Sequence, residues 1–450
     1  MANAFALHAE NRGDFDPVSV EGAVASVSGL GVEIEDRLSA LDIGARVSID
    51  RQQGGRQKPL MAEVVGVRQG LALCLPFGGL DGVRRGARAR FLKEEASARP
   101  SSAWLGRVID GLGRPIDGKG ALPSGGRAMP LRAAPPPAPL RARLGGRIDF
   151  GVKALNAFAP SREGQRLGIF SAAGVGKSEL LSMIARGAAC DVAVIALIGE
   201  RGREVREFIE DKLGEEGASR AVFIVATSDE PAMMRREAAF LAMTVAEYFR
   251  AEGAHVLCLL DSLTRIANAQ REIGLAAGEP PTAKGYTPSV FSLLPQVLER
   301  AGPGLDDGKA GRITGVFSVL VEGDDHDEPV ADAARAILDG HVVLDRRIAE
   351  RGRFPAVDIL RTLSRAMPGA VSEEEAGLAA AARRHASAYE DMREMIRIGA
   401  YRAGASAEVD RAIDFYPQLE RFLNQTSGEI VSTGDTFRAL AALCEEYDQR

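Results

Sequence analysis

The sequence contains few cysteines and no long apolar stretch. Its four cysteines, Cys74, Cys190, Cys258 and Cys444, are widely scattered, with no C-x-x-C pair and no metal-ligand spacing relative to the five histidines. This spacing predicts buried thiols in a reducing cytoplasm. The first residues show no basic region followed by an apolar core, and no run of ~18 apolar residues suggests a membrane span. We therefore expect a cytoplasmic protein without a signal peptide or transmembrane segment.

A net positive charge is also lacking. The net charge is −6 and the pI is about 5.7, so no global basic field draws the protein to nucleic acid or anionic lipid. What the chain does have is length and apolar content, with 450 residues, 46% of them hydrophobic and 26% charged. This composition is typical of a soluble globular protein, and the length allows two or three domains with separate cores.

The distribution of apolar residues divides the chain into regions. Over residues 18–91, short alternating segments are separated by Gly, Asp and Gln-Gly-Gly, which predicts a small all-β barrel or sandwich. The segment 106–146 is rich in Gly, Pro and Arg and predicts an extended connector crossing a surface. From about Met367 the pattern is mostly helical, and Ser372 with Glu375 has the spacing of a capping box.

From Ile148 onward, strands alternate with helices. Each candidate strand is a continuous apolar run, as expected when helices cover both faces of a parallel sheet. The clearest helix is predicted over 230–251, with an apolar stripe on one face. A doubly wound α/β domain is therefore expected, with candidate strands at 167–170, 192–198, 221–226, 255–260 and 313–321.

One stretch of this domain points to a ligand. Residues 167–181 are LGIFSAAGVGKSELL, an apolar strand followed by a loop of small residues and a helix start. Gly174 and Gly176 let backbone N–H groups approach an anion. Lys177 can reach the outer phosphates of a nucleotide, and Ser178 can ligate Mg²⁺. The pattern G-x-x-x-x-G-K-[ST] has Gly where this chain has Ser171, so an ordinary Gly-rich turn is the alternative to a phosphate-binding loop.

Two carboxylates follow later strands of the same domain. Glu200, in GERGREV, comes directly after the run 192–198, where ligands bind in open α/β sheets. It is a candidate to orient and polarise an attacking water, and a solvated charged turn is the alternative. Asp261 ends the run 255–260, and a carboxylate there can hold Mg²⁺ through its water shell. Its alternative role is to cap the helix that contains Leu263.

Longer blocks show a family resemblance. The sequence contains GVGKS, LIGERGREV, LLDSLTR, GEPPTAKGYTPSVFSLLPQVLERAG and VLVEGDDHDEPVADAARAILDGHVVLDRRIAERGRFPAVDILRTLSR. Together they closely resemble the export ATPases of type III secretion, and the flagellar branch is the better match through DGHVVLDRRIAERGRFPAVD and IRIGAY. The resemblance covers the chain from about residue 20 to its end. These enzymes are related to the catalytic subunits of rotary ATP synthases.

This resemblance implies the architecture. It implies an α/β P-loop (RecA-like) nucleotidase core with an N-terminal β-barrel and a C-terminal helical domain, assembled as a homo-hexameric ring. The boundaries that we expect are an N-terminal extension over 1–17, a β-barrel domain over 18–95, a connector over 96–147, a P-loop ATPase domain over 148–366 and a helical C-terminal domain over 367–450.

The resemblance also implies ATP and Mg²⁺ as cofactors, and in that family Ser171 is an accepted first loop residue. The implied ATP-binding residues are Ala173, Gly174, Val175, Gly176, Lys177, Ser178 and Glu179, with Phe354 stacking on adenine and Phe422 completing that pocket. For Phe354, core packing before Pro355 is the alternative. The implied metal-associated residues are Ser178, Asp261 through water and Glu204 through water.

The implied catalytic residues include Lys177 of the loop and Glu200, which matches the glutamate that activates the attacking water. Arg201 neighbours Glu200. Arg265 resembles the arginine close to the γ-phosphate. Arg365, in LSRAM, matches an arginine supplied by the neighbouring subunit. Such an arginine finger contributes on the order of 10³- to 10⁵-fold in rate, so a monomer is expected to be nearly inactive.

The resemblance implies several protein partners. The loop 278–286 faces the ring centre in the family, so we expect it to touch a central stalk or the export gate, and covering a strand end is its alternative. The N-terminal end is expected to meet a stator-like regulatory protein, and the helical C-terminal domain to dock export substrates and chaperones. The expected location is the cytoplasmic face of the export apparatus.

Four other functions remain as alternatives. The closest is the ATPase of a virulence-type type III secretion system, which shares the catalytic residues. A non-catalytic subunit of a rotary ring lacks the activating carboxylate, whereas this chain has Glu200. A ring-shaped RNA translocase is disfavoured by the net charge of −6 and the 5% aromatic content, so no nucleic acid is expected as a partner. The rotary synthase subunit itself is disfavoured by the family-specific blocks.

Overall fold

The computed structural model describes residues 20–92, 95–306, 308, 311–321 and 328–448. The predicted N-terminal extension over 1–17 lies outside these residues. The chain forms two compact units, one comprising the residues up to Ala96 together with Ile273–Glu279, and the other comprising Ser97–Glu272 and Pro280–Arg450. In the described part of the chain, no helix has the length and apolar character needed to cross a membrane.

The first unit contains a closed barrel of six strands in the order β1-β2-β7-β6-β3-β8. Neighbouring strands are antiparallel, and alternate residues such as Val32 and Ile34 are fully buried because successive side chains point to opposite faces. The predicted β domain is therefore a barrel and not a sandwich. The strands are β1 (Glu21–Ser28), β2 (Gly31–Glu35), β3 (Arg46–Ile49), β6 (Leu60–Arg68), β7 (Leu71–Pro76) and β8 (Arg88–Leu92), with a small hairpin of β4 (Gln52–Gln53) and β5 (Arg56–Gln57).

The second unit is organised around a nine-stranded sheet in the order β10-β16-β15-β17-β19-β14-β20-β21, with β18 paired to β19. Strands β10 to β20 of this order pair in parallel, whereas β21 is antiparallel to β20. Their bounds are β10 (Val108–Asp110), β14 (Arg166–Ser171), β15 (Val192–Ile198), β16 (Ala221–Ala226), β17 (His255–Asp261), β18 (Gly302–Pro303), β19 (Arg312–Leu320), β20 (Gly340–Leu344) and β21 (Val357–Ser364).

All five predicted strands of this sheet are present, and four further strands, β10, β18, β20 and β21, were not predicted. Strand β10 lies in the Gly- and Pro-rich segment that predicted an extended connector, and it pairs with β16 at the sheet edge. Strand β21 alternates buried and exposed residues because it too is an edge strand, so it lacks the continuous apolar run of the central strands. Strand β20 is only a five-residue element.

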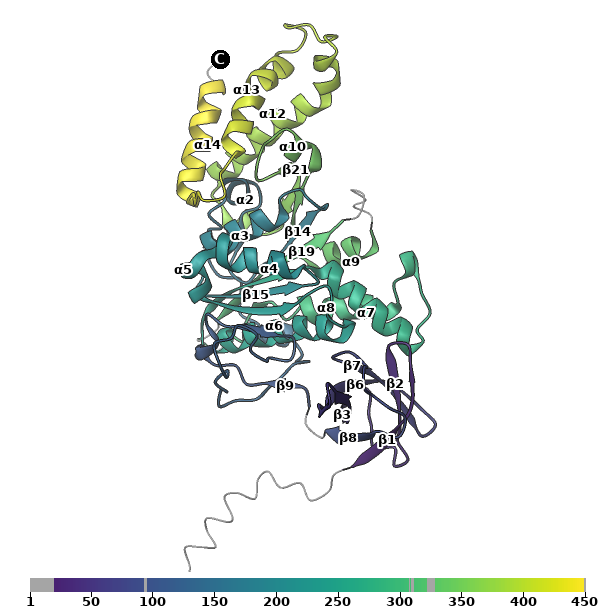
Figure 1. Ribbon diagram of the computed structural model, residues 1–450. Coiled ribbons are helices and arrows are strands. Elements are labelled where there is room, and N and C mark those ends of the chain that lie inside the picture. The colour runs from purple at the N-terminus through teal and green to yellow at the C-terminus, as the bar shows by residue number, and fades with distance from the viewer. Residues whose placement is uncertain (1–19, 93–94, 307, 309–310, 322–327, 449–450) are drawn as a thin grey trace, which may run out of the picture. The chain divides into compact units, whose positions relative to one another are not determined.

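Helices cover both faces of the sheet (Figure 1). One face is covered by α3 (Lys177–Gly187), α4 (Gly202–Glu207), the π-helical turn η4 (Phe208–Leu213) and α5 (Gly214–Ser219). On the other face, α6 (Ala232–Ala251) packs on β15 and β17 and is buried along most of its length. The remaining helices of the core are α2 (Lys153–Phe158), α7 (Leu263–Ala277), α8 (Pro288–Leu298), α9 (Pro329–Ile337), α10 (Arg346–Glu350) and α11 (Met367–Ala370).

The C-terminal region consists of α12 (Glu373–Arg397), α13 (Ala407–Leu423) and α14 (Thr433–Asp448). The predicted capping box is present, because the Ser372 hydroxyl accepts from the Glu375 N–H and the Glu375 carboxylate accepts from the Ser372 N–H. Phe415 and Leu440 of these helices join the same apolar core as the sheet residues and α3. The helical region is therefore packed onto the α/β core.

Candidate active site

The stretch from β14 to α3 forms a loop suited to an anion. Gly174 and Gly176 have φ values of 78° and 91°, a left-handed conformation that glycine adopts without strain. Gly176 precedes α3, and no side chain in the described residues caps this helix end. The first N–H groups of α3 and the positive end of its dipole are thus directed at the loop, as in phosphate-binding sites.

Lys177 brings two carboxylates together. Its Nζ lies 3.3 Å from Glu200 Oε1 and also forms an ion pair with Asp261 Oδ1, to which Ser318 Oγ donates a hydrogen bond of 2.5 Å. The contact arises because β14, β15 and β17 are parallel and their carboxyl ends lie along one edge of the sheet. Asp261 therefore faces the phosphate-binding loop and does not cap α7. The Glu200 side chain is only 16% exposed, which does not fit a solvated turn.

The electrostatics of this cluster follow from its burial. Burial, and after it the negative charge of Asp261, raises the pKa of Glu200 above its ordinary value. Burial alone would lower the pKa of Lys177, but the charges of Asp261 and Glu200 outweigh it, so that the pKa of Lys177 is raised. The lysine is therefore firmly cationic, while Glu200 holds a proton more readily than an ordinary glutamate does.

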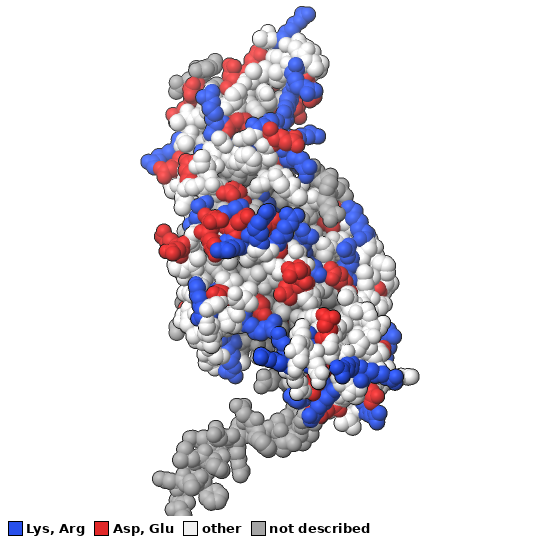
Figure 2. Space-filling model, in the orientation of Figure 1, with Lys and Arg blue, Asp and Glu red and all other residues white. Residues whose placement is uncertain are grey.

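The other charged residues predicted around Glu200 have different surroundings. The side chain of Arg265 packs against Gly199, where an added Cβ would lie 2.7 Å from the Arg265 Cβ, and its buried Nε has no hydrogen-bond partner in the described structure. Arg201 is 76% exposed and forms an ion pair of 3.1 Å with Glu204. Glu204 also contributes to the raised pKa of Glu200. The surface around α4 and η4 displays side chains of both signs (Figure 2). Arg203 and Glu207 there form an ion pair of 3.3 Å.

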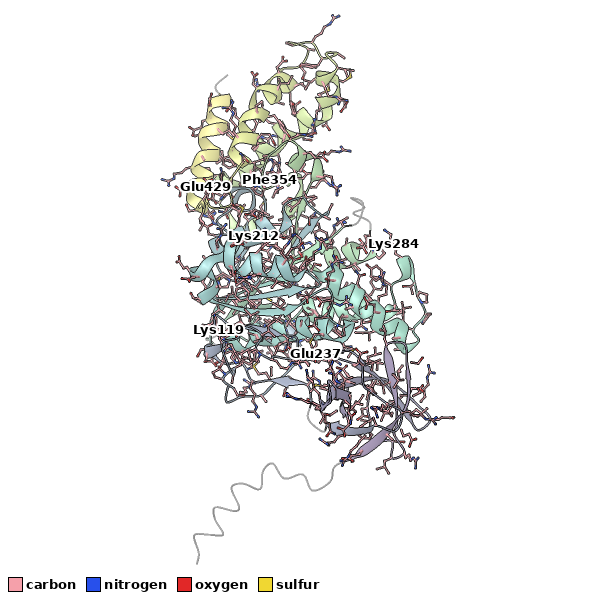
Figure 3. The ribbon with its side chains drawn as sticks, viewed as in Figure 1. Lys119, Lys212, Glu237, Lys284, Phe354 and Glu429 are labelled. Carbon is pink, nitrogen blue, oxygen red and sulfur yellow. The ribbon has the colours of Figure 1, made fainter. Side chains whose placement is uncertain are left out.

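A cavity of about 300 Å³ adjoins the first turn of α3. Phe354 lies on its wall, where the sheet meets the C-terminal helices (Figure 3), and is 42% exposed, so it is not packed in the core. The cavity is lined by Gly176, Glu179, Leu180, Met183, Phe354, Pro355 and the residues 424–427. Phe422 is not in this lining, and its ring instead faces Lys153 Nζ at 5.8 Å.

Two residues of the cavity were missed at the sequence level. The Phe354 N–H donates to Asn424 Oδ1 at 3.1 Å, and the Gln425 N–H donates to the Phe354 carbonyl at 2.8 Å. Gln425 also accepts from the Lys153 N–H at 2.8 Å. Both residues follow α13 directly, so the break in helical pattern after Leu423 was the signal that could have found them. They connect the aromatic wall to the C-terminal helices.

Arg365 lies far from this site within its own chain. Gly340 is in register with Leu167 at the start of β14 and with Ser364 at the end of β21, whereas Leu344 is in register with Ser171, where the loop begins. Four residue steps of a parallel strand span about 13 Å. The exposed Arg365 is therefore at the opposite end of the sheet from Lys177 and cannot serve its own loop.

The oxygen donors around Lys177 fit Mg²⁺ in a nucleotide complex. Ser178 lies in the first turn of α3, and the carboxylates of Asp261 and Glu200 both reach the lysine beside it. Among the described residues, no group of three or more His, Cys, Asp and Glu side chains is arranged to hold a metal ion. Mg²⁺ in nucleotide sites is commonly bound through one or two carboxylates together with substrate phosphates.

The glycine loop at the end of a central parallel strand, with a lysine held by two carboxylates, defines a P-loop nucleotidase. Comparison with known proteins supports this class. The nucleotide-binding domain of the ATP synthase alpha/beta family matches residues 151–364, the beta-barrel domain of that family matches 24–93, and the T3SS EscN ATPase C-terminal domain matches 371–442.

Individual relatives identify a narrower family within this class. The flagellum-specific ATP synthase of Caulobacter vibrioides is 55% identical over 436 residues, which cover 96% of this chain and 98% of that protein. The SPI-2 type 3 secretion system ATPase of Salmonella typhimurium is 48% identical, with 82% and 84% covered. The chain belongs to the ATP synthase alpha/beta family and, within it, to the ATPases of flagellar type III protein export.

Solved structures of a type III secretion ATPase have the same fold as this chain. The assembled ATPase EscN from the type III secretion system of enteropathogenic E. coli has a TM-score of 0.87 at 40% identity, with 94% of this chain and 99% of that chain covered. A structure of EscN in complex with its central stalk EscO has a TM-score of 0.83 at 39% identity, with the same coverage.

Proposed function

We propose that the protein hydrolyses ATP at the subunit interfaces of a homo-hexameric ring and that this hydrolysis is coupled to export of flagellar proteins by a type III secretion apparatus. The observation that supports interfacial catalysis is the position of Arg365 at the opposite end of the sheet from Lys177. A site that needs this arginine can obtain it only from a neighbouring chain. The family assignment supports the coupling to export.

In the proposed mechanism, Lys177 and the N–H groups of the loop residues Ala173, Gly174, Val175 and Gly176 hold the phosphates of ATP. Glu200 orients the attacking water and accepts its proton, a role for which a buried carboxylate with a raised pKa is suited. Arg265 approaches the γ-phosphate from the side of Gly199, and Arg365 of the next subunit stabilises the transition-state charge. Exposed Arg201 is assigned only to the periphery of this site.

Mg²⁺, when bound with ATP, supplies charge neutralisation at the outer phosphates. Ser178 and Asp261 are the residues proposed to hold it, with Glu204 supporting its water shell. Phe354 is proposed to stack on the adenine, and the cavity beside Glu179 receives the base and sugar. Because Phe422 does not line that cavity, we assign it a supporting role behind Lys153.

The proposed partners follow the family plan. The loop with Ala283–Gly285 at its tip, closed by a hydrogen bond of 2.6 Å from the Thr282 N–H to the Tyr286 carbonyl, is proposed to contact a central stalk or the export gate. The N-terminal end is proposed to bind a stator-like protein, and the C-terminal helices to receive substrates and chaperones at the cytoplasmic face of the apparatus.

Two measurements test the proposal. ATP hydrolysis per chain is expected to rise steeply with protein concentration as rings assemble, and a constant specific activity from monomer to ring would contradict interfacial catalysis. A deletion strain is expected to lose flagellar filaments and motility, whereas intact motility with lost secretion of virulence proteins would favour the virulence-type system.

A further inference from the structure

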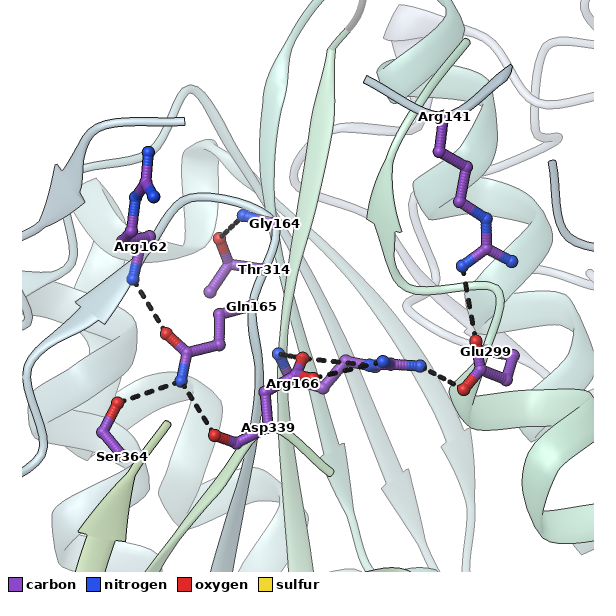
Figure 4. A network of polar contacts seen from close by, with 9 residues as sticks. All are labelled: Arg141, Arg162, Gly164, Gln165, Arg166, Glu299, Thr314, Asp339 and Ser364. Carbon is purple, nitrogen blue, oxygen red and sulfur yellow. Dashed lines mark hydrogen bonds and ion pairs between the residues drawn. The ribbon is translucent and has the colours of Figure 1, made fainter. Parts of the chain in front are cut away.

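A polar network around Gln165, Arg166 and Asp339 lies where strand β14 begins (Figure 4), and it holds the backbone of Arg365. The Arg365 N–H donates to the Asp339 carbonyl at 2.9 Å, and the preceding residue, Ser364, is buried at the end of β21. The Arg365 side chain is exposed, and no carboxylate of the described residues pairs with it. A solvent-facing arginine thus extends from a rigid buried base.

Gln165 is the centre of this base. It is fully buried, and its Nε2 donates to the Asp339 carbonyl at 3.3 Å and to Ser364 Oγ at 3.1 Å. Its Oε1 accepts from the Arg162 N–H at 3.0 Å. Ser364 Oγ in turn donates to the Pro160 carbonyl at 2.6 Å. The Gln165 amide therefore binds both Asp339, whose carbonyl accepts the Arg365 N–H, and Ser364, which precedes Arg365 in the chain.

Asp339 is fixed from the other side by Arg166. Its carboxylate accepts from the Arg166 N–H at 3.0 Å, from Nε at 3.1 Å and from Nη2 at 3.2 Å. Arg166 continues to Glu299, which also receives Arg141 Nη1 at 3.3 Å. Part-buried polar networks of this kind favour one geometry, since a shift breaks several hydrogen bonds at once.

Close packing at Gly340 also restricts the backbone position where β21 ends. Gly340 follows Asp339, and a Cβ added there would lie 2.8 Å from the Leu363 carbonyl and 3.1 Å from the Ser364 Cα. Strand β21 can therefore approach β20 closely only because residue 340 is glycine. Hydrogen bonds and packing together define where the chain leaves the sheet at Arg365.

We propose that Gln165, Asp339 and Ser364 are positioning residues that aim Arg365 at the ATP site of the neighbouring subunit. The inference rests on the proposed function of Arg365. It adds a physical link between the two sites, because Arg166, which follows Gln165, begins strand β14, and the other end of β14 carries the chain's own phosphate loop. A misplacement of about 1 Å in a catalytic group can cost ~10²-fold in rate.

Mixed rings test the inference. Subunits with Arg365→Ala keep an intact ATP loop, and subunits with Lys177→Ala keep an intact arginine, so rings mixed from the two regain hydrolysis at some interfaces. Adding Gln165→Met to the Lys177→Ala chain is expected to lower this regained rate by ~10-fold or more, because the arginine donor is misaimed. The same substitution on the Arg365→Ala chain is expected to lower it less than about two-fold.

A matched control distinguishes a change in the orientation of Arg365 from a general loss of protein stability. Thr314 is buried at the same sheet edge and accepts the Gly164 N–H at 2.9 Å, but it has no bond to Asp339, Ser364 or Arg365 (Figure 4). Thr314→Val is expected to have equal effects on either chain. If Gln165→Met impairs folding, Ser364→Ala removes one bond of the network with a smaller change, and the same contrast between chains is expected.

The outcomes are distinct. Equal losses from Gln165→Met on both chains, or no loss on the arginine-donating chain, would overturn the positioning role while leaving that of Arg365 intact. Homogeneous Arg365→Ala rings that hydrolyse ATP at the wild-type rate would overturn both the role of Arg365 and this inference. A larger loss on the donating chain, reproduced by Ser364→Ala, supports it.

Discussion

The ammonium group of Lys177 lies 3.3 Å from the carboxylate of Glu200, although the two residues belong to different strand–helix units of the sheet. Asp261 shares the same ammonium, so one buried cation faces two buried anions. ATP phosphates would have to draw the lysine away from both carboxylates. Under the proposed function, the phosphates of ATP compete with Glu200 and Asp261 for this ammonium group.

Glu200→Gln is expected to lower hydrolysis by roughly 10²- to 10⁴-fold, the range attributed to general acid–base catalysis. ATP affinity is expected to stay within a few-fold of wild type, because the amide preserves the shape of the site. Single-turnover hydrolysis and equilibrium binding of a fluorescent ATP analogue measure the two quantities. Glu207→Gln, on an exposed ion pair of the same region, is the control and should retain activity. Parallel loss of binding would assign Glu200 a structural role.

Glu200→Gln is also expected to stabilise the nucleotide-free protein near neutral pH. The pKa of Glu200 in the folded state lies above its ordinary value of 4.5, so the folded state favours the protonated form. Ionisation thus costs stability once the pH rises through the folded-state pKa, and the neutral amide avoids that cost. Thermal unfolding should show a higher Tm for the variant at pH 7 and no such advantage below pH 4.5. A lower Tm at pH 7 would contradict this.

Arg365→Ala is expected to lower hydrolysis by assembled rings by ~10³-fold or more. Binding of ATP to the isolated chain should be unchanged, since the arginine is remote from its own loop. Arg361→Ala is the matched control, because Arg361 is an exposed arginine of β21, the strand that Arg365 follows, and its nearest carboxylate partner, Asp345, is 3.9 Å away. Sedimentation must show that rings still assemble. Unchanged hydrolysis by such rings would refute the assignment.

Phe354→Ala is expected to weaken ATP binding by about 1–3 kcal/mol, the usual value of one stacked base. Little stability should be lost, because the ring is 42% exposed. Phe354→Tyr is expected to keep the affinity, and Phe422→Ala to change it less, because Phe422 does not line the cavity. Calorimetric titration with ATP measures all three. If Phe422→Ala weakened ATP binding more than Phe354→Ala does, Phe422 would be assigned to the adenine pocket.

Charge reversal at Lys284 or Glu279 is expected to weaken stalk binding or export with basal ATP hydrolysis unchanged. Lys284 lies in the 3-10 turn Ala283–Gly285. Glu279 and Lys284 belong to the same loop, whose counterpart in the family faces the ring centre. Co-sedimentation with the stalk protein and secretion assays in a complemented deletion strain measure these effects. If the variants changed neither stalk binding nor export, the proposed contact would be refuted, and the loop would only cover a strand end.

The sequence by itself determined the local elements of the protein. Continuous apolar runs predicted the five central strands because residues of a covered parallel sheet are buried on both faces, and the glycines and lysine of the phosphate loop lie within one short segment. The capping box at Ser372 was also predictable, since both of its partners are three residues apart. Such features depend on neighbours along the chain.

Only the tertiary structure decided which distant residues meet. Lys177 contacts Asp261 although 84 residues separate them, because the order of strands places β17 two positions from β14. Edge strands β10 and β21 were missed since a half-exposed or very short strand has no distinctive apolar run. The antiparallel pairing of β21 places Arg365 at the sheet end opposite the phosphate loop, and this separation is what makes a neighbouring subunit necessary for the proposed site.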